Sequence, residues 1–182
     1  MAISEKLNDE RSLAMVLNSL GGVLQRLGQF QEAADALRKS HQLLVKQGDE
    51  RGQAMVLNSL GGVLDRLRLY IESDATFEQS IQLGEKLRDS LHLAKVLTAY
   101  GQRVLSRGNP NKAVDLLRRG YQIDLERTNR RGLQIVTASL VNALLALRNE
   151  DEARRVLDEA LVHMPGDLKL LRLRHRFIKP IR

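Results

Sequence analysis

The chain has 182 residues, the length of one domain or one short array of repeats, and 43% of them are hydrophobic, which is enough to form a core. No apolar run approaches the roughly 18 residues of a membrane-spanning helix, and the first residues lack the basic-then-apolar pattern of a secretory signal. Cysteine is absent, which excludes disulfide scaffolds, thiolate nucleophiles and cysteine-ligated zinc. We therefore expect a cytoplasmic protein that does not enter the membrane.

The formal net charge of +7 is distributed unevenly. Residues 1–91 contain 11 Lys and Arg against 13 Asp and Glu, whereas residues 92–182 contain 18 against 9. The basic end of the chain includes Arg172, Arg174, Arg176, Lys179 and Arg182. This asymmetry indicates either an acidic or nucleic-acid partner or a solvated, solubilising surface, and the sequence leaves both open.

An internal repeat organises the chain. The segment from Ala14 to Leu24 recurs without change from Ala54 to Leu64. The second copy thus begins 40 residues after the first. Two more shifts by 40 residues reach residues 94–104 and 134–144, which keep the apolar spacing but diverge in sequence. We therefore predict four units, at about 9–48, 49–88, 89–128 and 129–167.

Each unit has the pattern of two helices. In the first unit, apolar residues at steps of three and four predict an amphipathic helix whose core-facing stripe is Leu13, Val16, Leu17, Leu20, Leu24 and Leu27. Gly28 and Gln29 interrupt this pattern, and a second helix follows. In the third unit, Asn109 and Pro110 form a helix start, with Asn109 as the N-cap. No alternating pattern typical of strands occurs, so we predict an all-α fold.

The ends of the chain carry further signals. Residues 3–9 resemble residues 83–89, so they have the pattern of the end of a second helix. At the other end, Asp167 is expected to cap a final helix over about 167–178, which Lys179 and Pro180 stop. That helix is either a terminal cap or half of a fifth unit. We expect that the chain is a fragment of a longer protein.

The residues of these units resemble the tetratricopeptide repeat (TPR) family. The first unit matches its signature at Leu17, Leu20, Gly21, Leu24, Gly28, Phe30, Ala33, Leu37 and Ser40. The period is longer than that of the standard repeat and is similar to that of kinesin light chains. The resemblance implies a right-handed α-α superhelix, a TPR solenoid of four helix-turn-helix repeats plus the C-terminal capping helix. The fourth unit departs from the pattern, with Val141 in place of the packing glycine.

In this family the first helices of successive units line a concave surface, which implies a peptide-binding groove. Helical phase assigns to it the residues on the side opposite the core stripe. They are Met15, Asn18, Gly22, Gln25 and Arg26; Met55, Asn58, Gly62, Asp65 and Arg66; Lys95, Thr98 and Gln102; and Ile135, Ala138 and Asn142. Because an amide both donates and accepts, we expect Asn18, Asn58 and Asn142, with Lys95 and Gln102, to hold the backbone of an extended peptide.

Two details of this surface are ambiguous in the sequence. Gly22 and Gly62 either let a ligand approach the backbone or are drift within a duplicated unit, and Met15 and Met55 are either adaptable contacts or ordinary packing. The clamp of Lys and Asn side chains that binds a carboxylate in chaperone-binding TPR proteins is absent, because Asn18 and Asn58 occupy positions at which that clamp requires Lys.

Catalysis is not expected. The sequence has no phosphate-binding Gly-rich motif, and its four histidines, His41, His92, His163 and His175, have no metal-ligand spacing. We therefore expect no enzyme activity, cofactor or metal. The leading hypothesis is a scaffold that binds a protein or peptide in the groove. Nucleic-acid or acidic-partner binding through the basic half, and a sensor arm of a multidomain signalling protein, are alternatives, and the oligomeric state stays open.

Overall fold

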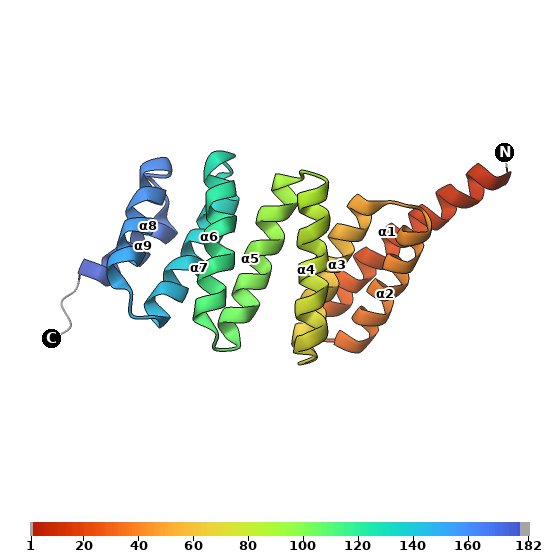
Figure 1. The fold of residues 1–182 in the computed structure, drawn as a ribbon, viewed down its shortest axis with the longest axis horizontal. Helices are drawn as coiled ribbons and strands as arrows, with labels where there is room; N and C mark the ends of the chain where they lie inside the picture. Colours follow the sequence, from red (N-terminus) through yellow and green to blue (C-terminus); the bar gives the residue numbers. More distant parts are fainter. Residues whose placement is uncertain (1, 179–182) are drawn as a thin grey trace. The chain divides into compact units, whose positions relative to one another are not determined.

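The computed structural model describes the backbone of residues 2–178 and the side chains of residues 9–175 and 177. This part of the chain forms α-helices joined by short turns, with no strand, which confirms the predicted all-α fold (Figure 1). The helices are α1 (Ala2–Arg26), α2 (Phe30–Lys46), α3 (Glu50–Arg66), α4 (Tyr70–Lys86), α5 (Ser90–Ser106), α6 (Pro110–Glu126), α7 (Arg130–Ala146), α8 (Glu150–His163) and α9 (Leu168–Ile178). The chain divides into two compact units between His92 and Leu93, in the first turn of α5.

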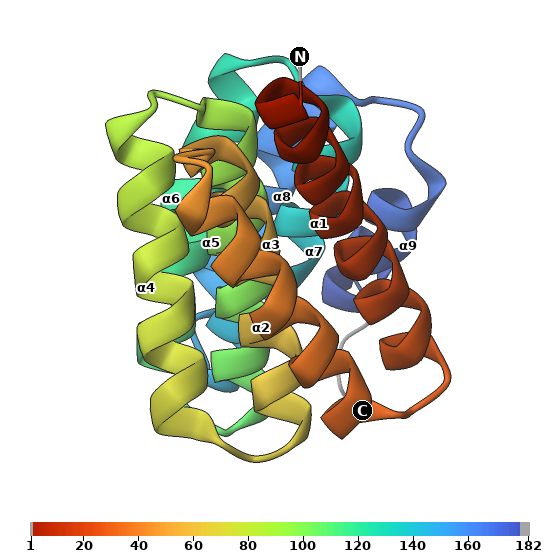
Figure 2. The same ribbon diagram turned by 90° about the vertical axis from the view of Figure 1, so that its right-hand side faces the viewer.

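Unit 1 consists of two helical hairpins, α1–α2 and α3–α4, with α2 packed against α3 (Figure 2). Within each hairpin, a glycine of the first helix faces a large residue of the second. A Cβ atom on Gly21 would lie 2.6 Å from Cγ of Leu37, and one on Gly61 would lie 2.9 Å from the Phe77 ring. The two helices of each hairpin therefore cross at these glycines, because no larger residue fits there without displacing its neighbour.

Buried serines also connect the two helices of each hairpin in unit 1. The Ser40 hydroxyl donates to the carbonyl of Ala14 at 2.7 Å, and that of Ser80 donates to the carbonyl of Ala54 at 2.8 Å. The two serines make this hydrogen bond at the same point of successive repeats, and the Ser80 hydroxyl also lies 3.0 Å from Nε2 of His92. Their small size allows the helices to approach closely, while the hydrogen bond satisfies a hydroxyl that is completely buried.

The turns that join the helices occur twice in each repeat unit, so successive turns are separated by half of the repeat period. Each turn between successive helices from α1 to α8 contains one residue in the left-handed region, with φ between 50° and 80°. These residues are Gly28, Gly48, Arg68, Arg88, Gly108, Thr128 and Arg148. The following residue is the N-cap of the next helix, and where it is Asp or Asn its side chain caps that helix, as Asn109 does by accepting from the backbone N–H of Lys112 at 3.2 Å. The predicted cap at Asn109 is thus confirmed.

Unit 2 repeats the same construction over α5–α8 and adds α9 against α7 and α8. A Cβ on Gly101 would lie 2.6 Å from Cγ of Leu117, as at the equivalent crossings of unit 1. In the next hairpin Val141 occupies the glycine position and is fully buried. Asp167 caps α9 as predicted, accepting from the N–H groups of Lys169 and Leu170 at 3.0 and 3.1 Å. The predicted stop at Lys179 and Pro180 lies outside the described residues.

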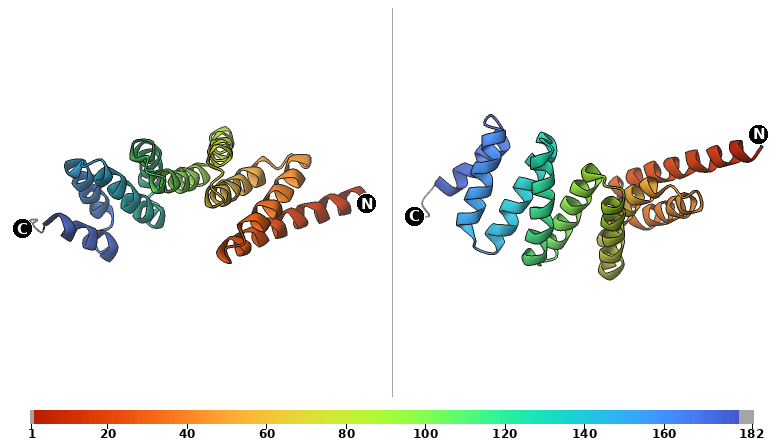
Figure 3. Two further views of the ribbon diagram at one scale, coloured as in Figure 1. Left: turned by 90° about the horizontal axis from the view of Figure 1, so that it is seen from below. Right: turned by 45° about the horizontal axis from the view of Figure 1, so that its top comes forward.

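Two predictions for the first helix are wrong. α1 is continuous from Ala2 to Arg26, whereas residues 3–9 were expected to end a separate helix; Figure 3 shows its first turns extending past α2. The predicted core stripe is mostly exposed as well: Leu13, Val16, Leu20 and Leu27 each have at least 44% of their surface accessible. The buried side of α1 instead contains Ala14 and Gly21, because α2 contacts that side and no described helix covers the stripe.

Candidate functional site

A hollow of about 400 Å³ lies in unit 1 between α1, the end of α2 and the start of α3; we call it the α1–α3 hollow. Both first helices of the unit, α1 and α3, contribute residues to it. Its lining residues are Arg11, Ala14, Met15, Asn18, Ser19, Leu44, Asp49, Arg51, Gly52, Met55 and Val56. Three of the groove residues predicted from helical phase, Met15, Asn18 and Met55, are therefore brought together here.

Asn18 has an unsatisfied acceptor in this hollow. Its Oδ1 atom is buried and has no hydrogen-bond partner among the described residues. Asn58, one repeat later, also has a buried Oδ1 atom with no hydrogen-bond partner among the described residues. A buried acceptor without a donor costs roughly 1–3 kcal/mol. A turn of either side-chain amide that presents Oδ1 to an N–H or O–H of a ligand recovers this cost.

Met15 and Met55 provide the apolar part of the hollow. Both belong to the duplicated segment and both are more than half exposed, at 65% and 53%. An exposed thioether chain is flexible and polarizable, so it adjusts to side chains of different shape. The sequence left open whether these methionines pack internally, and their exposure favours the contact role.

Charged residues lie around the hollow. Arg11 of α1 lies 3.5 Å from the Asp49 carboxylate, and Arg51 of α3 lies 2.9 Å from the Asp89 carboxylate. The N–H of His92 and the Arg51 guanidinium hold the pKa of Asp89 below its ordinary value, since both bind the ionised form. Sequence reasoning missed these pairs, although Arg11 and Arg51, like Asp49 and Asp89, are separated by one repeat period.

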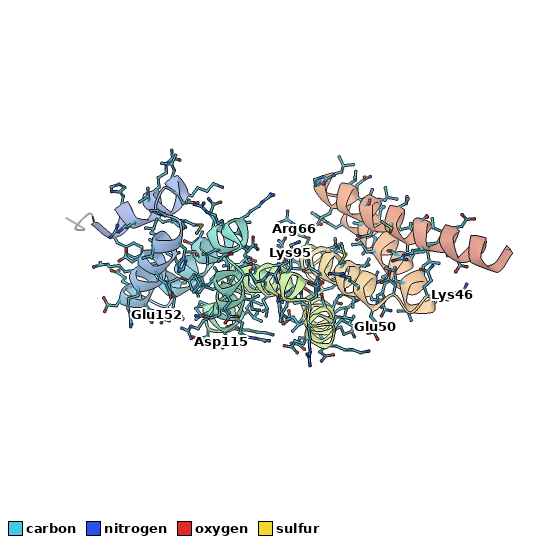
Figure 4. The ribbon with its side chains drawn as sticks, turned by 90° about the horizontal axis from the view of Figure 1, so that it is seen from above. Lys46, Glu50, Arg66, Lys95, Asp115 and Glu152 are labelled. Carbon is cyan, nitrogen blue, oxygen red and sulfur yellow. The ribbon has the colours of Figure 1, made fainter. Side chains whose placement is uncertain are left out.

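The other predicted groove residues of unit 1 have varied environments. Nothing lies within 4 Å of a Cβ on Gly22, and only the Gln25 amide, at 3.8 Å, approaches one on Gly62, although Gly62 is itself buried. Arg26 is exposed, but Asp65 is only 8% exposed. The Arg66 guanidinium stacks 5.2 Å from the Phe30 ring centre, at the far end of α3 from Glu50 (Figure 4).

The predicted groove residues of unit 2 have varied environments as well. Lys95 and Asn142 are exposed, Ile135 is partly exposed and Ala138 is half-buried. Thr98 is buried, with its hydroxyl 3.1 Å from a Cβ built on Gly120, so it belongs to the α5–α6 crossing. The Gln102 amide donates to the Ser139 hydroxyl at 2.8 Å, which connects α5 to α7. Gln102 is thus hydrogen-bonded within the unit, unlike the acceptors of Asn18 and Asn58.

Part of the basic charge of unit 2 is paired with acids of the same unit. Arg118 binds Glu152, and Arg174 lies 2.9 Å from the Asp158 carboxylate. Arg130 and Arg131 are exposed at a second hollow that also contains Asp167. The predicted basic residues Arg176, Lys179 and Arg182 lie outside the described side chains.

Two further classes of site are not found in the described part of the chain. No three His, Asp or Glu side chains converge there as a metal site would require. None of the described helices combines the length and the apolar composition that crossing a bilayer requires.

Comparison with known proteins identifies the repeats. One Tetratricopeptide repeat model matches residues 52–126 and another matches residues 13–46, together more than half of the chain. Comparison with curated proteins gives no match.

Solved structures show the same fold. BtubC (BKLC) from P. vanneervenii aligns with a TM-score of 0.73 at 18% identity, over 85% of this chain and 65% of that one, so the chain spans about two thirds of the BtubC structure. A kinesin light chain protein of Podospora anserina with nearly identical TPR-like repeats aligns with a TM-score of 0.74 at 18% identity, over 87% of this chain and 78% of that one.

Proposed function

This chain belongs to the tetratricopeptide repeat family, with repeats of the kinesin light chain type, and we propose that it binds an extended peptide segment of a partner protein in the α1–α3 hollow. TPR repeats form a scaffold that is generally used for protein–protein interaction and is typically not enzymatic. The observation that carries the proposal is the unsatisfied Oδ1 atom of Asn18 in a hollow flanked by two exposed methionines.

The residues of the hollow define what it would bind. Asn18 offers an acceptor for a backbone N–H, which every extended peptide presents. Met15 and Met55 offer an adaptable apolar surface for one or two side chains of the peptide. We therefore propose a ligand that places a short extended stretch at this point, with at least one apolar side chain and few charges.

A protein ligand is favoured over a nucleic acid. Arg118 and Arg174 of the basic unit are neutralised by Glu152 and Asp158, which reduces the charge available for phosphates. Aromatic residues, on which single-stranded bases stack, are only 3% of the chain.

Selection of peptides against the full chain tests this proposal. Peptides chosen from a random library would be measured by fluorescence anisotropy against the wild type and the Asn18→Ala, Asn58→Ala double variant. We expect the double variant to bind at least tenfold more weakly, because it removes the Asn18 acceptor of the hollow together with its repeat equivalent Asn58, which lies outside the lining residues. Its melting temperature should not fall, since neither Oδ1 atom accepts a hydrogen bond from the described chain.

Ile71→Ala is the matched control. Ile71 of α4 is 91% exposed and lies outside the hollow, so this variant should bind the selected peptides as the wild type does. Equal affinity of wild type and double variant for every selected peptide would place the binding site elsewhere and refute the proposal.

A further inference from the structure

One face of α1 is apolar and uncovered. The side chains of Leu13, Val16, Leu20 and Val23, with Leu27 in the following turn, are between 41% and 68% exposed. They recur at alternating steps of three and four residues and so form one continuous stripe, which we call the α1 stripe. Four large apolar residues on one helix, with a fifth in the turn that follows, form the kind of exposed patch that marks an interaction surface.

The chain contains a second copy of this apolar surface, on α3, and that copy is buried. The segment from Ala54 to Leu64 of α3 is identical to the segment from Ala14 to Leu24 of α1. In α3, however, Val56 is 2% exposed, Leu60 is 5% exposed and Val63 is fully buried. Because the residues are the same, the difference comes only from what packs against each helix.

Helix α2 is what covers the copy. Its residues Ala33, Leu37 and Leu44 belong to the same core cluster as the three buried residues of α3. The structure therefore shows one solution to the packing of this surface, an amphipathic helix with small and branched apolar residues on the facing side. The α1 stripe is the same surface one repeat earlier, without that helix.

We propose that the α1 stripe docks an amphipathic helix of a partner polypeptide that resembles α2 on its apolar side. This surface is separate from the α1–α3 hollow. At about 100° per residue, Asn18 points to the opposite side of α1 from the middle of the stripe. The two sites can thus be occupied at the same time, one by an extended segment and one by a helix.

Two differences between the copies specify this helix further. A Cβ on Gly52 of α3 would lie 2.7 Å from Cδ2 of Leu44, but the equivalent residue of α1 is Ser12. The partner helix therefore has a residue smaller than leucine where α2 has Leu44. In addition, Gln53 donates to the Leu44 carbonyl at 3.3 Å, whereas α1 has Leu13 at that position, so this end of the partner contacts an apolar side chain instead.

The probe is a labelled peptide with the sequence of α2, residues 30–46, kept helical by a lactam bridge between the exposed side chains of Asp35 and Lys39. Two versions would be titrated with the full chain, the unaltered sequence and one carrying Leu44→Ala. We expect saturable binding of both, tighter for Leu44→Ala, and a loss of at least tenfold when the protein carries Leu20→Asp. Val16→Asp, at a residue 61% exposed, gives a second test if Leu20→Asp lowers the helical content.

Ile71→Asp, on α4, is the control for an added charge at an exposed apolar residue. It should leave the affinity for both peptides unchanged. The proposal is overturned if neither peptide binds, or if Ile71→Asp weakens binding as much as Leu20→Asp does. Self-association of the wild type that Leu20→Asp abolishes would also overturn it, because the occupant would then be a second copy of α1.

Discussion

Gly21 of α1 and Leu37 of α2 are in such close contact that a Cβ on the glycine would lie 2.6 Å from Cγ of the leucine. Cγ is near the root of the side chain, so the leucine cannot simply swing its tip away. We expect Gly21→Ala to force the two helices apart, at a cost of roughly 1–3 kcal/mol from overpacking. Thermal unfolding followed by circular dichroism would measure this loss.

The adjacent residue, Gly22, provides the matched comparison. Nothing lies within 4 Å of a Cβ at this position, so Gly22→Ala adds no clash and gains helix propensity of about 1 kcal/mol. We expect it to raise the melting temperature. Since both variants receive the same propensity gain, the difference between their unfolding free energies isolates the overpacking at Gly21. Similar stabilities of the two variants would contradict the crossing described here.

Thr128 occupies the left-handed region, with φ of 52°, in the turn between α6 and α7. A β-branched residue is strained in this conformation, whereas glycine adopts it freely. We expect Thr128→Gly to stabilise the protein by about 0.5–1 kcal/mol, the strain relief being partly offset by the larger entropy of the unfolded chain. Chemical denaturation with urea would detect the shift of the midpoint.

Gly108, in the turn between α5 and α6, allows the reverse substitution, because glycine already occupies the left-handed position there, with φ of 80°. There, Gly108→Ala should destabilise the chain by about 1 kcal/mol. If Thr128→Gly and Gly108→Ala both left the urea midpoint unchanged, the left-handed conformation would not limit stability in these turns.

Asp89 makes stability depend on pH in the acid range. Its pKa in the folded chain is lowered from the ordinary 3.8, chiefly by the hydrogen bond from the His92 N–H and also by Arg51. A carboxyl whose pKa falls on folding contributes stability above its unfolded pKa, and this contribution is lost as the pH falls below about 4 through the folded pKa. Unfolding free energies measured between pH 7 and pH 3 would show this decline.

Asp89→Asn tests the charge separately from the cap. Asparagine still accepts the His92 N–H hydrogen bond, but it forms no ion pair with Arg51. We expect a loss of about 0.2–1 kcal/mol at pH 7 and a smaller decline toward pH 3 than in the wild type. An equally steep decline in the variant would assign the acid sensitivity to other carboxyl groups.

Much of the architecture could be predicted from the sequence because it depends on local patterns. The exact duplication of Ala14–Leu24 fixes the period, and the glycines within it mark the crossings that Gly21 and Gly61 make with Leu37 and Phe77. Helix phase also placed Met15, Asn18 and Met55 together, because side chains on one face of a first helix stay on one side of a stack.

The sequence could not show which residues of a helix would be covered by another helix. Val16 and Val56 occupy the same place in two identical segments, Ala14–Leu24 and Ala54–Leu64, yet one is 61% exposed and the other 2% exposed. Likewise Asp65 and Thr98, predicted to line a groove, are buried, because burial depends on which helices surround a position. A stripe specifies that a helix has an apolar side, since that follows from the helical repeat, but whether that side is covered follows from packing alone.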